Sequence, residues 1–187
     1  MGRDKAALLL HGRTLLARAV DLVRRAGGEP LVVGPVSVEA LVPGCRRIDE
    51  TESGGPRPRG GPLPALRHGL AVGGAPKVFA LACDLPCLPE ALVRFLIDAA
   101  DRYDAVVPRA GGLLQVLAAA YTTACIPAID RQLEAGERAT HRFLDAVSLR
   151  VIEEPDLMPF GGGEIFLNVN RPADLARAEA RLAGSEA

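Results

Sequence analysis

The feature that most limits the fold of this chain is a set of short apolar runs that lack alternating polar residues. Residues 77–83 read KVFALAC, and the segments 31–33 and 104–108 contain similar runs. A strand that faces water on one side alternates apolar and polar residues, whereas a strand covered on both faces does not. The chain is therefore expected to form a sheet that is buried on both faces.

Patterns typical of helices separate these runs. Residues 13–26 place apolar side chains on one helical face and end at a Gly-Gly pair, and the segments 62–70 and 89–100 both have proline in the first turn. The other expected elements are strands at 46–48, 111–121 and 149–154, an extended piece at 166–170, and helices at 37–41, 123–135, 142–147 and 172–182. This order predicts an α/β, doubly wound domain with a mostly parallel sheet and helices on both faces.

Length and composition are those of one globular domain. A chain of 187 residues with 49% hydrophobic residues can bury a substantial core, so residues 1–187 are expected to form one domain. The net charge of −1 gives no general attraction to nucleic acid or to an anionic membrane, and aromatic residues are only 4%. No apolar stretch approaches the ~20 residues of a membrane span and no signal-peptide pattern is present, so a cytoplasmic location is expected.

The four cysteines do not form a metal-binding pattern. The two nearest, Cys83 and Cys87, are separated by three residues, and the three histidines are scattered along the chain. Reduced thiols in a cytosolic protein are the expected state.

Polar residues gather where strands and helices end. In an open parallel sheet, ligands bind beyond the carboxyl ends of the strands. We call the edge of the sheet at these carboxyl ends the rim. Five residues lie directly beside the expected strands and helices and are therefore expected at the rim: Lys5, Asp49, Asp84, Asn168 and Asn170. Carboxylates with few competing histidines or thiols suit Mg²⁺, and a lysine supplies a point charge for phosphate. The Gly/Pro-rich segment 53–64 is interpreted as a functional loop of the same rim.

Each of these residues also has an ordinary structural interpretation. Asp84 before Leu-Pro could form a turn, an asparagine could cap the last helix, and Lys5 could be solvated. Because all of these residues are expected at one rim, a site for a phosphorylated ligand is favoured, but the type of reaction cannot be inferred from them.

The order of motifs is more specific. The segments MGRDKAALLLHGRTLL, GGPLPALRHGL, ALACDLPCLP, QVLAAAY and FLNVNRPADLARAE together resemble the molybdenum cofactor guanylyltransferase family of nucleotidyltransferases, over nearly the whole chain. The resemblance implies a Rossmann-like nucleotidyltransferase fold. It also implies transfer of GMP from GTP to the phosphate of molybdopterin, with Mg²⁺ as cofactor and pyrophosphate as the second product.

The resemblance assigns a role to each rim residue. It implies that the catalytic residues are Lys5, which neutralises the triphosphate, and Asp84, which holds Mg²⁺ and contacts the nucleotide. The other implied contacts are Asp49 in the nucleotide pocket, Gly61 where backbone approaches the nucleotide, and Asn168 and Asn170 beside the acceptor phosphate or metal.

The start of the chain departs from the family pattern. The family normally has a strand and a Gly-Gly-x-Ser-x-Arg loop before the Met-Gly-x-Asp-Lys with which this sequence opens. We therefore expect MGRDK to be the tail of a phosphate-binding loop, the first strand to be missing, and Met1 to mark a misplaced start. A sheet without that strand would expose an apolar edge, which is an aggregation hazard.

Three functional hypotheses follow. The first is the guanylyltransferase, with GTP and molybdopterin as partners and transient contacts with other molybdenum cofactor proteins. The second is a sibling enzyme that uses another nucleotide, such as the cytidylyltransferase of the same pathway. The third is an inactive protein that binds a nucleotide or cofactor, because the phosphate loop is absent from the sequence.

Overall fold

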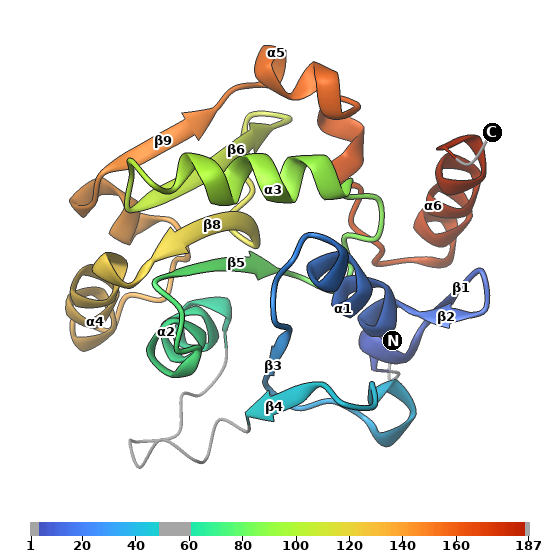
Figure 1. Ribbon diagram of the computed structural model, residues 1–187, viewed down its shortest axis with the longest axis horizontal. Coiled ribbons are helices and arrows are strands. Elements are labelled where there is room, and N and C mark those ends of the chain that lie inside the picture. The colour runs from blue at the N-terminus through green and yellow to red at the C-terminus, as the bar shows by residue number, and fades with distance from the viewer. Residues whose placement is uncertain (1–3, 49–60, 186–187) are drawn as a thin grey trace.

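The central sheet is the layer around which the chain is built. In this computed structural model, which describes residues 4–48 and 61–185, four strands lie in the order β5 (Lys77–Leu81), β8 (Ala118–Thr122), β6 (Ala105–Ala110) and β9 (Leu149–Ile152) (Figure 1). β8 is antiparallel to both of its neighbours, whereas β6 and β9 are parallel. β5, β6 and β9 therefore run in one direction, and the expected mostly parallel α/β sheet is confirmed.

Three shorter strand pairings accompany this sheet. β3 (Leu31–Val33) and β4 (Arg46–Ile48) form a separate parallel pair, and β1 (Leu9–Leu10) and β2 (Arg13–Thr14) form an antiparallel hairpin. β7 (Leu113–Leu114) pairs with the end of β6. The hairpin was not expected from the sequence, and its two-residue turn has positive φ at both central positions, His11 and Gly12.

Helices cover both faces of the central sheet. α3 (Glu90–Ala99) packs on one face, and α2 (Pro62–Val72) and α4 (Ile126–Glu134) pack on the other (Figure 1). α1 (Leu15–Arg25) contacts α3, and the short α5 (Glu154–Leu157) precedes the final helix α6 (Pro172–Ser185). The described residues also include short 3₁₀ helices, namely η1 (Lys5–Ala7), η2 (Val38–Ala40), η3 (Thr123–Cys125), η4 (Arg142–Ala146), η5 (Met158–Phe160) and η6 (Gly163–Phe166).

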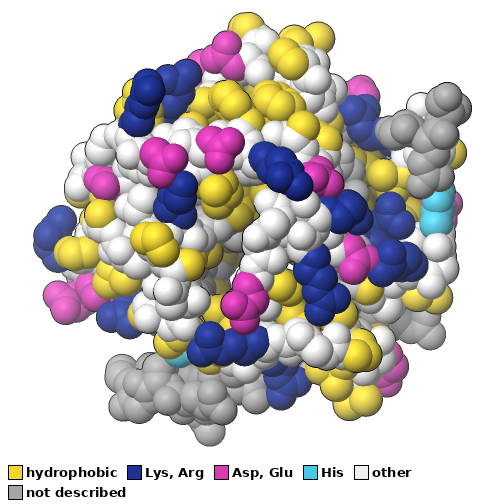
Figure 2. Space-filling view, viewed as in Figure 1, with side chains coloured by type: hydrophobic (Ala, Val, Ile, Leu, Met, Phe, Trp, Pro, Cys, Tyr) yellow, Lys and Arg dark blue, Asp and Glu magenta, His cyan; other side chains and the backbone are white. Residues whose placement is uncertain are grey.

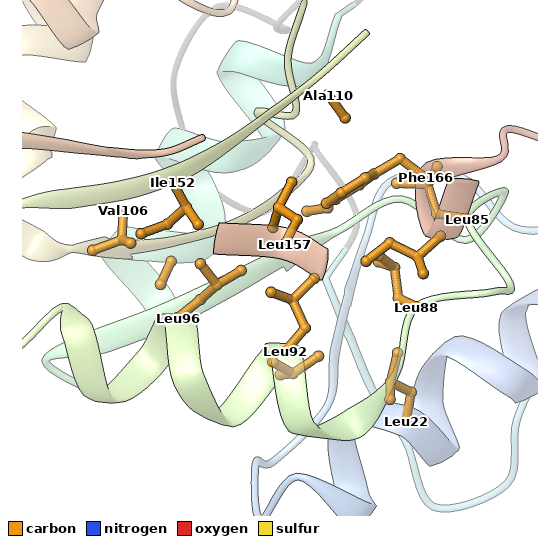
Figure 3. Close-up of a cluster of buried hydrophobic side chains, with 14 of the residues drawn as sticks. Leu22, Leu85, Leu88, Leu92, Leu96, Val106, Ala110, Ile152, Leu157 and Phe166 are labelled. Atoms are coloured by element: carbon orange, nitrogen blue, oxygen red, sulfur yellow. The ribbon is translucent and has the colours of Figure 1, made fainter. Parts of the chain in front are cut away.

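Successive side chains of the inner strands point into two different cores. Val106 of β6 packs with Leu92 and Leu96 of α3 (Figure 3). The next residue, Val107, and Tyr121 of β8 pack on the opposite face with α2 and α4. Each of these side chains is fully buried, and burying one large apolar side chain stabilises a fold by about 1.5–3 kcal/mol. Burial on both faces is the reason why these segments read as continuous apolar runs.

α1 shows why the first helix begins and ends where it does. The Thr14 hydroxyl accepts a hydrogen bond from the Ala17 N–H at 3.1 Å, which caps the first turn. Leu16 and Val20 are buried on the inner face, and arginines occupy the last turn, where they complement the helix dipole. Figure 2 shows that Lys and Arg side chains gather on this part of the surface.

Two expected strands differ from the structure at their ends. Residues 111–121 were predicted as one strand, which is wrong, because the chain turns between β7 and β8 through a hydrogen bond from the Ala118 N–H to the Gln115 carbonyl. The strand predicted at 149–154 ends at Ile152, since Pro155 fixes the first turn of α5 immediately afterwards.

Candidate active site

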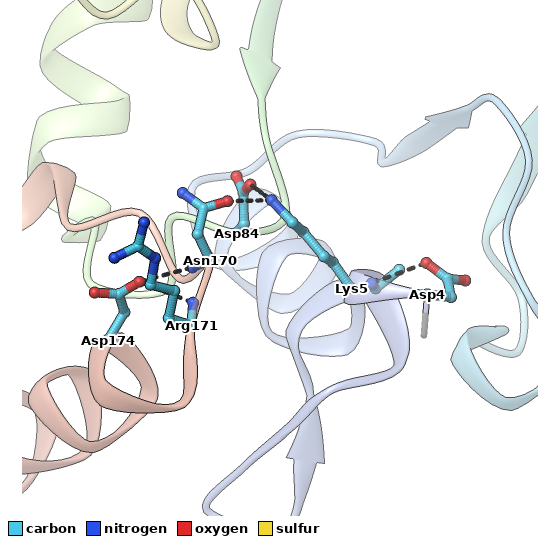
Figure 4. Close-up of polar contacts among 7 residues, drawn as sticks. Asp4, Lys5, Asp84, Asn170, Arg171 and Asp174 are labelled. Carbon is cyan, nitrogen blue, oxygen red and sulfur yellow. Dashed lines mark hydrogen bonds and ion pairs between the residues drawn. The ribbon is translucent and has the colours of Figure 1, made fainter. Parts of the chain in front are cut away.

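Three of the predicted rim residues meet at the carboxyl end of β5. Lys5 Nζ lies 3.4 Å from Asp84 Oδ2 and also donates a hydrogen bond to Asn170 Oδ1 (Figure 4). These residues come from η1, from the turn after β5 and from the segment before α6. The Lys5 and Asp84 side chains are 44% and 17% exposed, so the ammonium remains open to an incoming ligand while the carboxylate is partly enclosed.

Asp4 fixes the backbone that carries Lys5. Its carboxylate accepts hydrogen bonds from the Ala6 N–H at 3.0 Å and from the Ser37 N–H at 2.7 Å. The hydrogen bond from the Ser37 backbone lowers the pKa of Asp4 below its usual value. Sequence analysis overlooked this residue, although an aspartate directly before a helical turn is a recognisable capping signal.

Asp174 fixes the backbone that carries Asn170. Its Oδ2 accepts hydrogen bonds from the N–H groups of Asn170, at 3.1 Å, and Arg171, at 2.9 Å (Figure 4). The backbone is tied on the other side as well, because the Val169 N–H donates to the Asp84 carbonyl at 2.8 Å. An acid at the third position of a helix commonly bonds the backbone before it in this way.

The remaining predicted residues fall in three different situations. Asn168 is exposed and lies two positions before Asn170, with buried Val169 between them. Gly61 caps α2 with φ of 136°, a value that favours glycine, and open space lies where a side chain would begin. Asp49 lies outside the described residues.

The thiol closest to the site is Cys83. Burial and the neighbouring Asp84 carboxylate raise the pKa of this thiol to about 11, so it is protonated at neutral pH and is a poor nucleophile. All four cysteines are free. The described residues contain no group of three or more His, Cys, Asp or Glu side chains that could hold a metal ion by themselves.

The side-chain oxygens at the site are of the kind that Mg²⁺ binds. The Asp84 carboxylate and the Asn170 amide oxygen are hard donors brought together by Lys5. Mg²⁺ is commonly bound by one or two carboxylates together with phosphate oxygens of the substrate, so this donor set fits that ion better than zinc.

Comparison with known proteins identifies the family. Residues 1–151 match the family model of the MobA-like NTP transferase domain. The chain belongs to this family. The resemblance inferred from the motifs is therefore confirmed, and the protein is a nucleotidyltransferase.

Curated members of the family support this assignment. The probable molybdenum cofactor guanylyltransferase of Pelotomaculum thermopropionicum is 31% identical over 179 residues, which cover 95% of this chain and 85% of that protein. The molybdenum cofactor guanylyltransferase of Rhodobacter capsulatus is 36% identical over 196 residues, covering 97% and 90%.

Solved structures of NTP transferases share the fold. Molybdopterin-guanine dinucleotide biosynthesis protein A from Archaeoglobus fulgidus aligns with a TM-score of 0.77 and 20% identity, over 98% of this chain and 92% of that chain. The 2-C-methyl-D-erythritol 4-phosphate cytidylyltransferase of Thermus thermophilus aligns with a TM-score of 0.70 and 22% identity, over 94% and 92%. Among the described residues, no helix of this NTP transferase is long and apolar enough to span a membrane.

Proposed function

We propose that this NTP transferase transfers GMP from GTP to the terminal phosphate of molybdopterin and releases pyrophosphate. The observation that carries the proposal is the meeting of Lys5, Asp84 and Asn170 at one end of β5. Its curated relatives are named molybdenum cofactor guanylyltransferases, which supports the choice of substrates.

The reaction requires positioning and charge neutralisation. An oxygen of the acceptor phosphate attacks the α-phosphorus of GTP, and the bond from that phosphorus to the bridging oxygen of the β-phosphate breaks. The bonding electrons leave with pyrophosphate. Because the attacking phosphate is already anionic, the protein needs no strong general base, which agrees with a site built from Lys, Asp and Asn.

Each residue of the cluster has a defined task. Lys5 directs its ammonium to the β- and γ-phosphates and neutralises the charge that grows on the leaving group. Asp84 and Asn170 would hold Mg²⁺ through their oxygens; when bound, the ion neutralises phosphate charge and orients the phosphate oxygens. Asn168, two positions before Asn170, faces the acceptor phosphate in this proposal.

Guanine is the proposed base, and the carboxylates proposed to recognise it lie outside the described residues. A guanine edge presents N–H donors, which loop carboxylates such as Asp49 or Glu50 can accept. Gly61 contributes backbone that a nucleotide can approach closely, because no side chain stands there. Calorimetric titration with GTP and CTP measures this preference, and equal or tighter binding of CTP would assign the protein to the cytidylyltransferase branch.

The decisive experiment is an assay of pyrophosphate release. The protein is mixed with molybdopterin, Mg²⁺ and each of the four nucleoside triphosphates, and a parallel series contains EDTA. We expect release with GTP that depends on both molybdopterin and Mg²⁺. Binding of GTP without any turnover would instead support the non-catalytic hypothesis.

A further inference from the structure

One segment of the family pattern, QVLAAAY at residues 115–121, supplies no side chain to the cluster of Lys5, Asp84 and Asn170. It forms the turn before β8 and most of β8 itself. β8 lies beside β5, and Asp84 follows the carboxyl end of β5 (Figure 1). The hydrogen bonds of this segment therefore connect the interior of the sheet with the site.

The turn before β8 is closed by one hydrogen bond of its own. The Ala118 N–H donates to the Gln115 carbonyl at 2.9 Å. The central residues are then Val116 and Leu117, and a turn of this kind supplies no partner for their carbonyls. The hydroxyl of Tyr121 donates to the Val116 carbonyl at 2.8 Å. Tyr121 therefore fixes this turn from within the sheet.

The next carbonyl of the same turn holds the chain where it leaves β5. The Ala82 N–H donates to the Leu117 carbonyl at 2.8 Å. The carbonyl of Ala82 in turn accepts a hydrogen bond from the Leu85 N–H at 3.3 Å, which closes a second turn, and Asp84 lies inside that turn. The backbone of Asp84 is thus held by Leu117 through Ala82 on one side and by the Val169 N–H on the other.

The hydroxyl of Tyr121 is a constant donor in a buried place. The side chain is fully buried, and its ring packs against Phe143 with the ring centroids 5.9 Å apart. Burial raises the pKa of Tyr121 above its ordinary value of 10.0, so the hydroxyl stays protonated at neutral pH. The bond to the Val116 carbonyl is partly buried. Without this donor the carbonyl would lose its partner, and the turn would have to shift toward water.

We infer that Tyr121 is a positioning residue for Asp84. Its hydroxyl holds the turn before β8, that turn holds the Ala82 N–H, and Ala82 begins the turn that carries the Asp84 carboxylate. The inference rests on the proposed function, in which Asp84 would hold Mg²⁺. Loss of the hydroxyl should therefore weaken the response to Mg²⁺ without removing any group that touches a substrate.

Three variants are compared with the parent protein. Tyr121→Phe removes the hydroxyl under test. Tyr103→Phe removes the same group at the opposite end of the sheet, before β6, where the Tyr103 ring lies under the Arg150 guanidinium. Ile129→Val is the control for stability, because Ile129 is fully buried in the same core as Tyr121 and its shortening changes no hydrogen bond. Tyr121→Phe and Ile129→Val should each lower the Tm by about 2–6 °C.

The first readout is hydrogen exchange of the Ala82 amide in the protein without substrates. In Tyr121→Phe this amide should exchange about tenfold faster relative to the amides of β6, because its acceptor, the Leu117 carbonyl, moves with the turn. Tyr103→Phe and Ile129→Val should leave that ratio unchanged, since a general loss of stability speeds exchange of both sets of amides. An unchanged ratio in Tyr121→Phe, or the same change in Ile129→Val, would overturn the inference.

The second readout is the rate of pyrophosphate release as the Mg²⁺ concentration is raised, measured well below the Tm of every variant. The concentration that gives half of the maximal rate should rise about tenfold in Tyr121→Phe, whereas kcat at saturating Mg²⁺ should stay near that of the parent protein. The same Mg²⁺ dependence in Tyr121→Phe and Ile129→Val would contradict the inference. A parent protein that releases no pyrophosphate would refute the proposed function instead, and hydrogen exchange alone would then decide whether Tyr121 holds the turn of Asp84.

Discussion

Lys5 has two oxygen partners in the free protein, the Asp84 carboxylate and the Asn170 amide. A bound triphosphate offers this ammonium several charged oxygens, which are stronger acceptors than a neutral amide. In the proposed reaction, Lys5 therefore exchanges Asn170 for phosphate. The amide oxygen of Asn170, freed from Lys5, would then be able to help hold Mg²⁺ together with Asp84.

Replacing Asp84 by Asn should abolish Mg²⁺-dependent turnover while the protein stays folded. The substitution keeps the size of the side chain but removes the charge that would hold the ion. A loss of about 10²–10³ in rate is expected, similar to the loss of one strong oxyanion donor. Pyrophosphate release measures turnover and circular dichroism measures folding. Asp98→Asn, which changes an exposed acid on α3, is the control, and undiminished turnover in folded Asp84→Asn would remove Asp84 from the mechanism.

Asp4 should contribute stability that depends on pH. Its pKa is lowered in the folded state, so the contribution is present above the ordinary value of 3.8 and is lost as the pH falls through the lower folded pKa. Asp4→Ala should therefore reduce the free energy of unfolding by about 0.5–1 kcal/mol at pH 7, as expected for a lost cap. Urea titrations at pH 7 and pH 2.5 test this. A difference between the two proteins that persists at pH 2.5 would contradict the role of the carboxylate.

The residues that meet at the site could be predicted from sequence, but the residues that hold them could not. Lys5, Asp84 and Asn170 each stand next to a strand or helix end, and ends of strands share one rim. The partner of Asp4 is the Ser37 N–H, which lies 33 positions away, and no local pattern indicates this contact. Side-chain bonds to distant backbone depend on the final packing of loops.

At the scale of elements, the first turn of α6 links the end of the chain to the site. Asp174 bonds two backbone N–H groups there, including that of Asn170. Asp174→Ala should cost about 0.5–2 kcal/mol of stability and should raise the KM for the acceptor more than it lowers kcat. Denaturant unfolding and steady-state kinetics measure the two effects.

Glu179→Gln, further along the same helix, serves as the matched control for Asp174→Ala. It should leave both the stability and the KM near those of the parent protein. If Asp174→Ala lowered stability but left the KM unchanged, Asp174 would stabilise α6 without positioning Asn170.

The positions of the strands could be predicted from sequence because the strands are buried on both faces. The strand prediction was wrong where the chain makes a tight turn. Residues 105–107 form a continuous apolar strand because successive side chains enter different cores. The segment 111–121 contains similar residues, yet it divides into β7 and β8. Gly111 and Gly112 both have positive φ and turn the chain from β6 into β7. A second turn, closed by the hydrogen bond from the Ala118 N–H to the Gln115 carbonyl, separates β7 from β8.

At the scale of the whole molecule, the free thiols divide into two classes. Cys125 is fully buried, and burial together with the neighbouring Asp104 raises its pKa to about 12. Cys45 is only partly buried. In the native protein, a thiol reagent such as Ellman's reagent should modify Cys45 first, and Cys125 only as fast as the molecule unfolds. Mass spectrometry of partly labelled protein, with and without urea, measures this order, and early labelling of Cys125 in the native protein would contradict it.

The hydrogen bond from the Val169 N–H to the Asp84 carbonyl has a consequence for the synthesis of the protein. Lys5 and Asp84 leave the ribosome well before Val169 and Asn170. At about 5–20 residues per second, several seconds separate Asp84 from Asn170. A nascent chain can therefore form most of the central sheet before Lys5, Asp84 and Asn170 can meet. If the proposed roles of these residues are right, a prematurely terminated product that ends before Val169 should be inactive.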